Sequence, residues 1–293
     1  MNKKSLIIII YTIILFLVLY FFPINFQSNS ISILLSITTF IFSIFAGFSI
    51  ADRYKRLNKI RSNDGAERST LTYLYESSII FGNKFQKELR NVIEEYFINT
   101  LDYKIYDYHK TGKKLKKIEE CILSLNPKSS KQISFYGFFI DHLQEIKRSR
   151  GSTITAIGEK LSFFEWFIFI FLSIIITFCL ILINAPGLVY NIVITILGTC
   201  IFMILYFVFS LDRLSWKENE RIFEPYQKAF ESMGLLRYYN QNLLKSKRVK
   251  VPLNTSYRIA KFPYPYPDFR DKKVITINKN NNPLHLKKCL SLV

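Results

Sequence analysis

Apolar and charged residues are separated into long blocks along this chain. Neither residues 5–51 nor residues 166–211 contain an Asp, Glu, Lys or Arg. Each block is more than twice the ~20 residues that a helix needs to span ~30 Å of hydrocarbon. Turn-forming residues interrupt both blocks, after Pro23 in the first and over 184–187 in the second. Because a helix satisfies its own backbone in lipid, the pattern predicts two helical hairpins, with spans near 5–22, 31–51, 166–183 and 188–210.

The charged segments beside these spans predict their orientation. Residues 52–162 hold 21 Lys and Arg against 14 Asp and Glu, a net charge of +7, and residues 211–293 hold 17 against 7, a net charge of +10. The short hairpin loops are uncharged. Since cytoplasmic loops are enriched in Lys and Arg, we expect a multi-pass protein of the cell inner (plasma) membrane with both termini and the middle loop in the cytoplasm. A cleaved signal peptide is the alternative for the first segment, although its apolar stretch is longer than usual.

Periodic apolar residues predict helices in the charged segments as well. From Leu71 to Phe97 they recur at steps of three and four, which places them on one helix face. Asp64 and Glu67 resemble a capping box that would begin this helix. A similar stripe over 133–161 is expected to run directly into the third span. The predicted fold class is all-α: a polytopic membrane protein with four transmembrane helices in two hairpins and a helical cytoplasmic domain.

These patterns divide the chain into five parts. We expect a first transmembrane hairpin over 1–51, a cytoplasmic helical insert over 52–162, a second hairpin over 163–210 and a cytoplasmic helix over 211–243. Residues 244–293 are expected to form an extended or disordered basic tail, because the prolines of 262–267 exclude a helix there. The aromatic residues between those prolines favour docking of the tail on another surface.

Catalytic and cofactor motifs are absent from the sequence. It contains no Gly-rich phosphate loop, no G-x-S-x-G elbow and no H-E-x-x-H. Its 4 Cys and 3 His are dispersed without metal-ligand spacing. We therefore expect no enzyme, no cofactor and no metal site. A net charge of +18 is compatible with nucleic-acid binding, but no recognition motif accompanies it, so lipid headgroups and small anions are the expected partners.

The second span offers a candidate conduction path. Four apolar residues follow one another at steps of four, four and three, and a basic cluster comes directly after them: Ile37, Ile41, Phe45 and Phe48, then Arg53, Lys55 and Arg56. Where several subunits meet along such a stripe, apolar rings form a constriction that gates by dewetting, here with a cytoplasmic basic vestibule beneath it. Contact with lipid or with neighbouring helices is the alternative for the same side chains.

Short motifs along the chain resemble those of one family. An Arg ends the second span and a Glu opens the long helix, and three further motifs follow, at Arg148–Arg150, Phe163–Trp166 and Leu211–Arg213. In these features residues 5–235 resemble the bestrophin-like group of four-span membrane proteins, distant relatives of the bestrophin anion channels. The resemblance implies a pentameric channel that prefers anions, with the second span lining the pore and Ile37, Ile41 and Phe45 as its neck.

Two departures from that family limit what is carried over. Leu214-Ser215-Trp216 stands where members usually carry Pro-Phe and a Gly, and the acidic cluster that binds calcium in animal bestrophins is not recognisable. The leading functional hypothesis is an oligomeric, anion-conducting ion channel whose partners are the lipid bilayer, further copies of the chain and small anions, with no nucleic acid. A non-conducting membrane anchor or signalling scaffold, whose cytoplasmic helices bind a partner, is the alternative.

Overall fold

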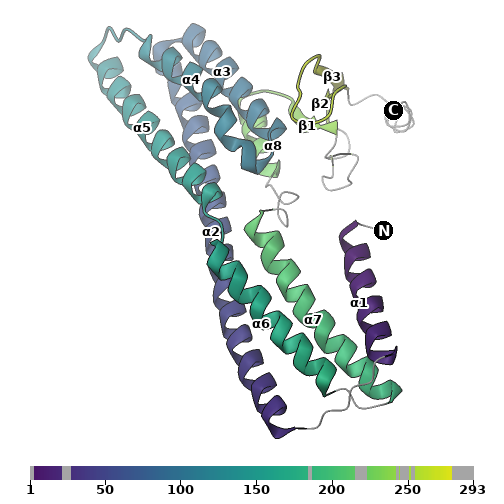
Figure 1. The fold of residues 1–293 in the computed structure, drawn as a ribbon. Helices are drawn as coiled ribbons and strands as arrows, with labels where there is room; N and C mark the ends of the chain where they lie inside the picture. Colours follow the sequence, from purple (N-terminus) through teal and green to yellow (C-terminus); the bar gives the residue numbers. More distant parts are fainter. Residues whose placement is uncertain are drawn as a thin grey trace. The chain divides into compact units, whose positions relative to one another are not determined.

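The chain folds into two compact units, which are described separately. A computed structural model describes residues 3–21, 28–183, 187–214, 223–241, 244, 251 and 255–278. The apolar unit comprises Met1–Asn58 with Glu159–Trp216, and the polar unit comprises Lys59–Gly158 with Lys217–Val293. Figure 1 labels the helices and strands of both units.

Four helices contribute to the apolar unit: α1 (Lys3–Phe21), the first part of α2 (Asn29–Ser77), α6 (Phe163–Leu182) and α7 (Leu188–Asp212). Within the described ranges, three helical stretches are long and apolar enough to cross a membrane. They are Asn29–Phe81, Ser130–Leu182, which includes a short interruption before α6, and Leu188–Asp212. The apolar part of α1, Leu6–Phe21, is shorter. The chain is thus a multi-pass membrane protein by length and composition, while the predicted number of four spans and their orientation stay predictions.

Close approach of two helices organises the apolar unit. α1 packs along α7, where a Cβ placed on Gly198 would lie 2.5 Å from the Leu15 Cδ2 atom. Small residues allow this approach of helix backbones in membranes. On α6, the ring of Phe169 is fully buried against the rings of Phe42 and Phe45 of α2, at centroid distances of 6.1 and 4.6 Å.

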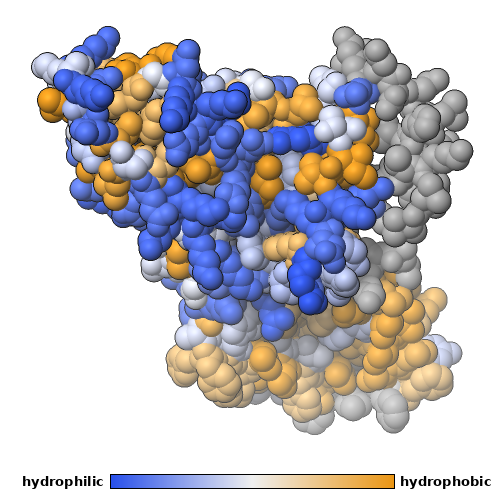
Figure 2. Space-filling model, turned by 90° about the horizontal axis from the view of Figure 1, so that it is seen from above, coloured by the Kyte–Doolittle hydropathy of each residue, from blue (hydrophilic) through white to orange (hydrophobic). Residues whose placement is uncertain are grey.

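The polar unit is a bundle of helices around a main apolar core. It contains the rest of α2, the 3-10 turns η1 (Ser78–Phe81) and η2 (Ile105–Thr111), and the helices α3 (Asn83–Asp102), α4 (Gly112–Leu123), α5 (Ser130–Gly158) and α8 (Phe223–Ser232). The predicted stripe on α3 forms part of the core, with fully buried Leu89, Ile93 and Phe97. Seen from above, hydrophilic residues cover much of the nearer part of the molecule, with hydrophobic patches between them (Figure 2).

A three-stranded sheet departs from the predicted all-α class. β1 (Arg237–Asn240) pairs in parallel with β2 (Tyr257–Lys261), and β2 pairs antiparallel with β3 (Lys273–Ile277). β2 and β3 lie in the part of 244–293 that the structure describes, where the sequence predicts an extended or disordered basic tail, and the chain is mostly helical. Buried Asp102 of α3 holds the sheet, because it accepts hydrogen bonds from the Tyr238 hydroxyl at 2.7 Å and the Lys272 ammonium at 2.5 Å.

Two predicted helix boundaries are wrong. α2 continues without a break from the second span through Asp64 and Glu67, so these residues form no capping box at a helix start. Conversely, the stripe over 133–161 does not continue into the third span, since α5 ends at Gly158 and α6 begins at Phe163. A capping box stands at that second boundary: the Ser162 hydroxyl accepts from the Glu165 amide, and the Glu165 carboxylate accepts from the Ser162 amide.

Candidate functional site

One face of α2 carries a continuous row of exposed apolar side chains. Ile37, Ile41, Ile44 and Phe48 are 52%, 48%, 45% and 73% exposed. They follow one another at steps of four, three and four, and exposed Ala51 and Lys55 continue the row at steps of three and four. We call these six residues the α2 stripe. Alternating steps of three and four keep side chains on one helix face, as at the seam between helices that pack around a common axis.

Phe45 lies at the flank of the α2 stripe. Its ring is partly buried and packs on Phe169 of α6, at a centroid distance of 4.6 Å. Of the four residues predicted to line a pore, Ile37, Ile41 and Phe48 therefore share the exposed row. Ile44, which the sequence prediction did not include, takes the position between Ile41 and Phe48.

The opposite face of α2 is buried, and two of the three predicted vestibule residues lie on it. Thr38, Phe42 and Ala46 pack inside the apolar unit, and Arg53 and Arg56 continue this buried face. Lys55, by contrast, is exposed on the α2 stripe. The structure thus separates the basic cluster into one exposed lysine below the apolar row and two buried arginines.

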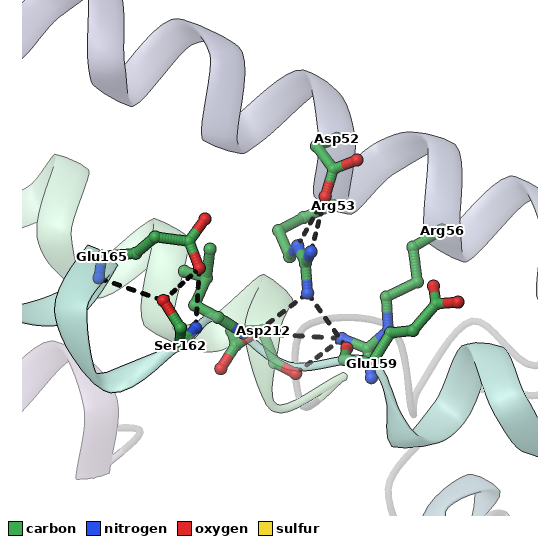
Figure 3. Close-up of polar contacts among 8 residues, drawn as sticks. Asp52, Arg53, Arg56, Glu159, Ser162, Glu165 and Asp212 are labelled. Atoms are coloured by element: carbon green, nitrogen blue, oxygen red, sulfur yellow. Dashed lines mark hydrogen bonds and ion pairs between the residues drawn. The ribbon is translucent and has the colours of Figure 1, made fainter.

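Asp212, the last residue of α7, binds both buried arginines (Figure 3). Its Oδ1 atom accepts a hydrogen bond from Arg53 Nη1 at 3.3 Å and another from the Leu161 amide at 2.8 Å. Its backbone carbonyl accepts from Arg56 Nη1 at 2.8 Å. Arg53 Nη1 also donates to the Glu159 carbonyl at 3.0 Å. We call these five residues the Asp212 cluster.

The Asp212 cluster joins three segments that are far apart in sequence. They are the end of the apolar part of α2, the linker before α6 and the end of α7. Arg53, Arg56 and Asp212 are all buried, and buried charges are stable only when they are paired and hydrogen-bonded. The cluster consequently fixes the rotation of α2 about its axis, with the arginine face inward and the α2 stripe outward.

Sequence reasoning missed the role of Asp212. The sequence does contain a pattern that indicates this role, since Asp212 is the first acid after a long uncharged block and two arginines follow the second span. Opposite charges at the same end of two adjacent spans favour pairing where water is scarce. Glu165, the acid that directly precedes the second uncharged block, instead caps α6 as described above.

No metal-binding arrangement occurs in the described parts of the chain, where no group of three or more His, Cys, Asp or Glu residues is placed to hold an ion. The cysteines described there, Cys121, Cys179 and Cys200, are free thiols. What the apolar unit does offer is an apolar surface row, a cation at its end and a buried charged cluster behind it.

Comparison with known proteins identifies the family and the fold. The profile of a family described as Bestrophin-like, with a Bestrophin-like domain, matches residues 6–214. No curated protein matches. Among solved structures, the chain is similar to a point mutant of a bacterial bestrophin homologue from Klebsiella pneumoniae, with 14% sequence identity and a TM-score of 0.55, over 78% of this chain and 97% of that chain. The structural likeness shows the fold, and because the family profile covers well over half of the sequence, the chain belongs to the Bestrophin-like family.

Proposed function

We propose that this protein is an oligomeric membrane channel that conducts anions through a pore lined by the α2 stripe. The observation that carries the proposal is the stripe itself: four large apolar side chains exposed on one face of α2, with Lys55 on the same face beyond them. Repeats of about 3.5 residues suit helices that meet around a shared axis. In a ring of subunits, each stripe position becomes a ring of identical side chains.

The chemistry of these rings supports a gated anion path. Rings of Ile and Phe make an apolar constriction, which water leaves unless the ring widens. Lys55 follows Phe48 by seven residues, which is about two helical turns or ~10 Å. A ring of lysines at that distance attracts anions to the constriction and repels cations. The Asp212 cluster supports the same proposal, because it holds the opposite face of α2 against the linker before α6 and the end of α7.

The proposed channel also has a subunit number, a membrane location and assigned roles for the predicted pore and vestibule residues. The family resemblance suggests five subunits, and the charge distribution suggests an inner membrane with both termini in the cytoplasm. Ile37, Ile41 and Phe48 keep their predicted pore-lining role, Ile44 joins them and Phe45 supports them from the flank. Of the predicted vestibule residues, Lys55 is the one proposed to meet the ion, and Arg53 and Arg56 are proposed to position α2.

One observation favours the alternative function, a scaffold that binds a partner protein. Several large apolar side chains are exposed on the polar unit, where lipid does not account for them: Tyr73, Ile79, Leu123 and Ile133. They are scattered over four elements, and single exposed apolar residues are normal on protein surfaces. The α2 stripe is continuous, so the channel is the better supported function.

Anion flux into liposomes that contain the purified protein tests the proposal. Ile41→Ala and Phe48→Ala each truncate one side chain of the α2 stripe and so widen the proposed constriction. Both are expected to raise the anion flux several-fold, because a wider apolar ring dewets less readily. Phe45→Ala is the matched control: it removes an aromatic ring from the same helix but from the face that packs on α6. Folded, inserted protein that passes no anion, as wild type and in both stripe variants, would favour the scaffold.

A further inference from the structure

A second polar cluster lies in the polar unit, around Glu67. This side chain of α2 is 3% exposed. Its Oε1 atom accepts a hydrogen bond from the Tyr96 hydroxyl of α3, and its Oε2 atom accepts one from the Tyr108 hydroxyl of η2. Both donors are neutral and themselves buried. The carboxylate therefore receives hydrogen bonds from two hydroxyl groups in a place that water does not reach.

Arg150 of α5 is the cation nearest this cluster, but its donors bind other groups. Arg150 Nη1 donates to the Tyr96 hydroxyl at 2.9 Å and to Thr111 Oγ1 at 2.8 Å. Arg150 Nη2 donates to the carbonyls of Tyr108 at 3.0 Å and His109 at 3.3 Å. Among the residues that the structure describes, no ion pair includes Glu67. The positive charge of Arg150 reaches the carboxylate only through the tyrosine hydroxyls.

The other charged and titratable groups around Glu67 lie on α2 and α8. Asp64 and Arg68 of α2 form an ion pair at 3.5 Å. The Tyr226 hydroxyl of α8 donates to Asp64 at 2.7 Å, and the Arg68 guanidinium lies 5.1 Å from the centre of the Tyr226 ring. Arg68 is therefore engaged with Asp64 and Tyr226, while the negative charge of Asp64 disfavours a second negative charge on Glu67.

The balance of these effects favours the neutral form of Glu67. Burial is the largest cause and raises the pKa of Glu67 to about 7, the charge of Asp64 acts in the same direction, and the hydrogen bonds of Tyr108 and Tyr96 and the charge of Arg150 oppose it. A carboxyl that is buried without a direct cation commonly takes up a proton instead of remaining charged.

We propose that Glu67 is a proton-binding site that makes the packing of the polar unit depend on pH near neutrality. The inference does not rest on conduction, since every group in it belongs to the polar unit. It concerns a residue outside the apolar part of α2, which ends at Ala51.

Both protonation states of the site can be fully hydrogen-bonded. In the charged state, Tyr96 and Tyr108 each donate to one carboxylate oxygen. In the neutral state, a proton from solvent binds Glu67 Oε2, and the new O–H group donates to the Tyr108 oxygen. The Tyr108 hydroxyl then turns toward the Tyr96 oxygen, 3.4 Å away, while Tyr96 still donates to Oε1. No covalent bond other than the new O–H bond forms or breaks.

The direction of the pH effect follows from the raised pKa of Glu67. Between its ordinary value of 4.5 and about 7, the unfolded chain loses this proton and the folded chain keeps it. The folded state then binds more protons than the unfolded state, so the polar unit loses stability as the pH rises through this interval. Above pH 7 neither state holds the proton, and this contribution changes no further. Glu67 thus holds α2, α3 and η2 together most tightly when it is protonated.

Infrared difference spectroscopy of the full-length protein in lipid nanodiscs tests the proposal directly. The spectrum of the wild-type protein minus that of Glu67→Gln should show the carbonyl stretch of a protonated carboxyl at mildly acidic pH. As the pH is raised, this band should disappear with a midpoint near the pKa of Glu67. Glu95→Gln is the matched control, because Glu95 pairs with Lys114 and Lys117 and the pKa of its carboxyl is lowered. That substitution should leave the band unchanged.

A second variant keeps the carboxyl and covers the case in which Glu67→Gln does not fold. Tyr108→Phe removes one donor to the carboxylate, so the midpoint of the same band should move to higher pH. The midpoint temperature of thermal unfolding of the wild-type protein should decrease from pH 5 to pH 7. The decrease should be smaller in Glu67→Gln. The proposal would be overturned if the spectrum of Glu67→Gln itself contained the same pH-dependent band. It would also be overturned if Tyr108→Phe left the midpoint of the band unchanged.

Discussion

At the scale of single residues, Asp212 and Glu67 show how burial acts on the same chemical group in different surroundings. Asp212 lies beside two arginines that donate directly to its carboxylate and carbonyl oxygens. Glu67 has two tyrosine donors and a cation that is one hydroxyl away. The absence of a direct cation favours the neutral form of a buried acid, as at Glu67. The first arrangement gives a structural anchor and the second gives a titratable site.

Replacing Asp212 with Ala is therefore expected to be strongly destabilising. Removal of one partner from a buried ion pair costs about 3–5 kcal/mol, because it leaves uncompensated charge. Here Arg53 and the Leu161 amide would lose the carboxylate oxygen that accepts their hydrogen bonds. Arg56 would keep its bond to the backbone carbonyl but lose the carboxylate 4.0 Å from its Nη1 atom. Asp212→Asn keeps an acceptor for that amide and should cost less. The free energy of unfolding in mixed detergent micelles measures the difference.

Asp52 provides the control for that measurement. It also pairs with Arg53, at 2.5 Å, but 60% of its side chain is exposed. Exposed ion pairs contribute about 0–1 kcal/mol, so Asp52→Ala should be nearly neutral. Equal losses of stability in Asp52→Ala and Asp212→Ala would mean that the Asp212 cluster does not anchor α2.

At the scale of elements, the sequence predicted most helices but not all of their ends. The uncharged blocks and the steps of three and four located α1, α3, α6 and α7, because apolar periodicity reports the environment of a helix face. The helix start predicted at Asp64 is wrong, because a change from apolar to charged residues marks the end of the lipid environment and not the end of the helix. α2 meets no proline there and continues to Ser77. The sequence pattern also did not predict the rotation of α2 about its axis, because packing against α6 decides whether Phe45 or Ile44 is exposed.

The sheet was missed because its strands are short and separated by unlike segments. β1 has four residues, and β2 and β3 have five each. The prolines of 262–267 correctly exclude a helix, but they lie between two strands, where they end pairing without preventing it. Contacts that the sequence does not display hold the sheet, above all the buried carboxylate of Asp102 with Tyr238 and Lys272.

Packing of α1 on α7 yields a prediction at this scale. Gly198→Ala places a methyl group 2.5 Å from Leu15 Cδ2, the far end of a flexible side chain that can shift, whereas Gly198→Val adds two further methyl groups at the same contact. We expect a small loss of stability for Ala and about 1–3 kcal/mol for Val, as for other overpacked sites. Unfolding in mixed micelles measures both variants.

Two further variants make that prediction specific to the contact. Leu15→Ala combined with Gly198→Val should recover part of the loss, because it removes the atoms that clash. Gly47→Ala is the control on another helix, since nothing lies within 4 Å of a Cβ placed there. Failure of the double variant to recover stability would show that Gly198 is needed for a reason other than its contact with Leu15.

At the scale of the whole molecule, a single chain leaves the α2 stripe uncovered. Large continuous apolar surfaces on a protein usually mark an interface. The other helices of the apolar unit also expose Ile, Leu and Phe side chains, as expected in lipid, but on α2 the row leads into Lys55. A cation that shares a face with an apolar row suits an aqueous path better than contact with lipid tails. The anion preference proposed for the channel therefore depends on this one lysine.

Reversing that charge should alter which ions pass. A unit charge acts on an ion ~6 Å away in water by about 0.7 kcal/mol, so a ring of several lysines contributes enough for a preference of about tenfold or more. Lys55→Gln is expected to reduce the ratio of anion to cation permeability, and Lys55→Glu to invert it, in reversal-potential measurements on reconstituted protein. Lys128→Glu makes the same change of charge at an exposed site between α4 and α5 and should leave the ratio unaltered. Equal shifts from both glutamate variants would assign selectivity to the overall charge of the protein, whereas a shift confined to position 55 would place the ion beside the α2 stripe.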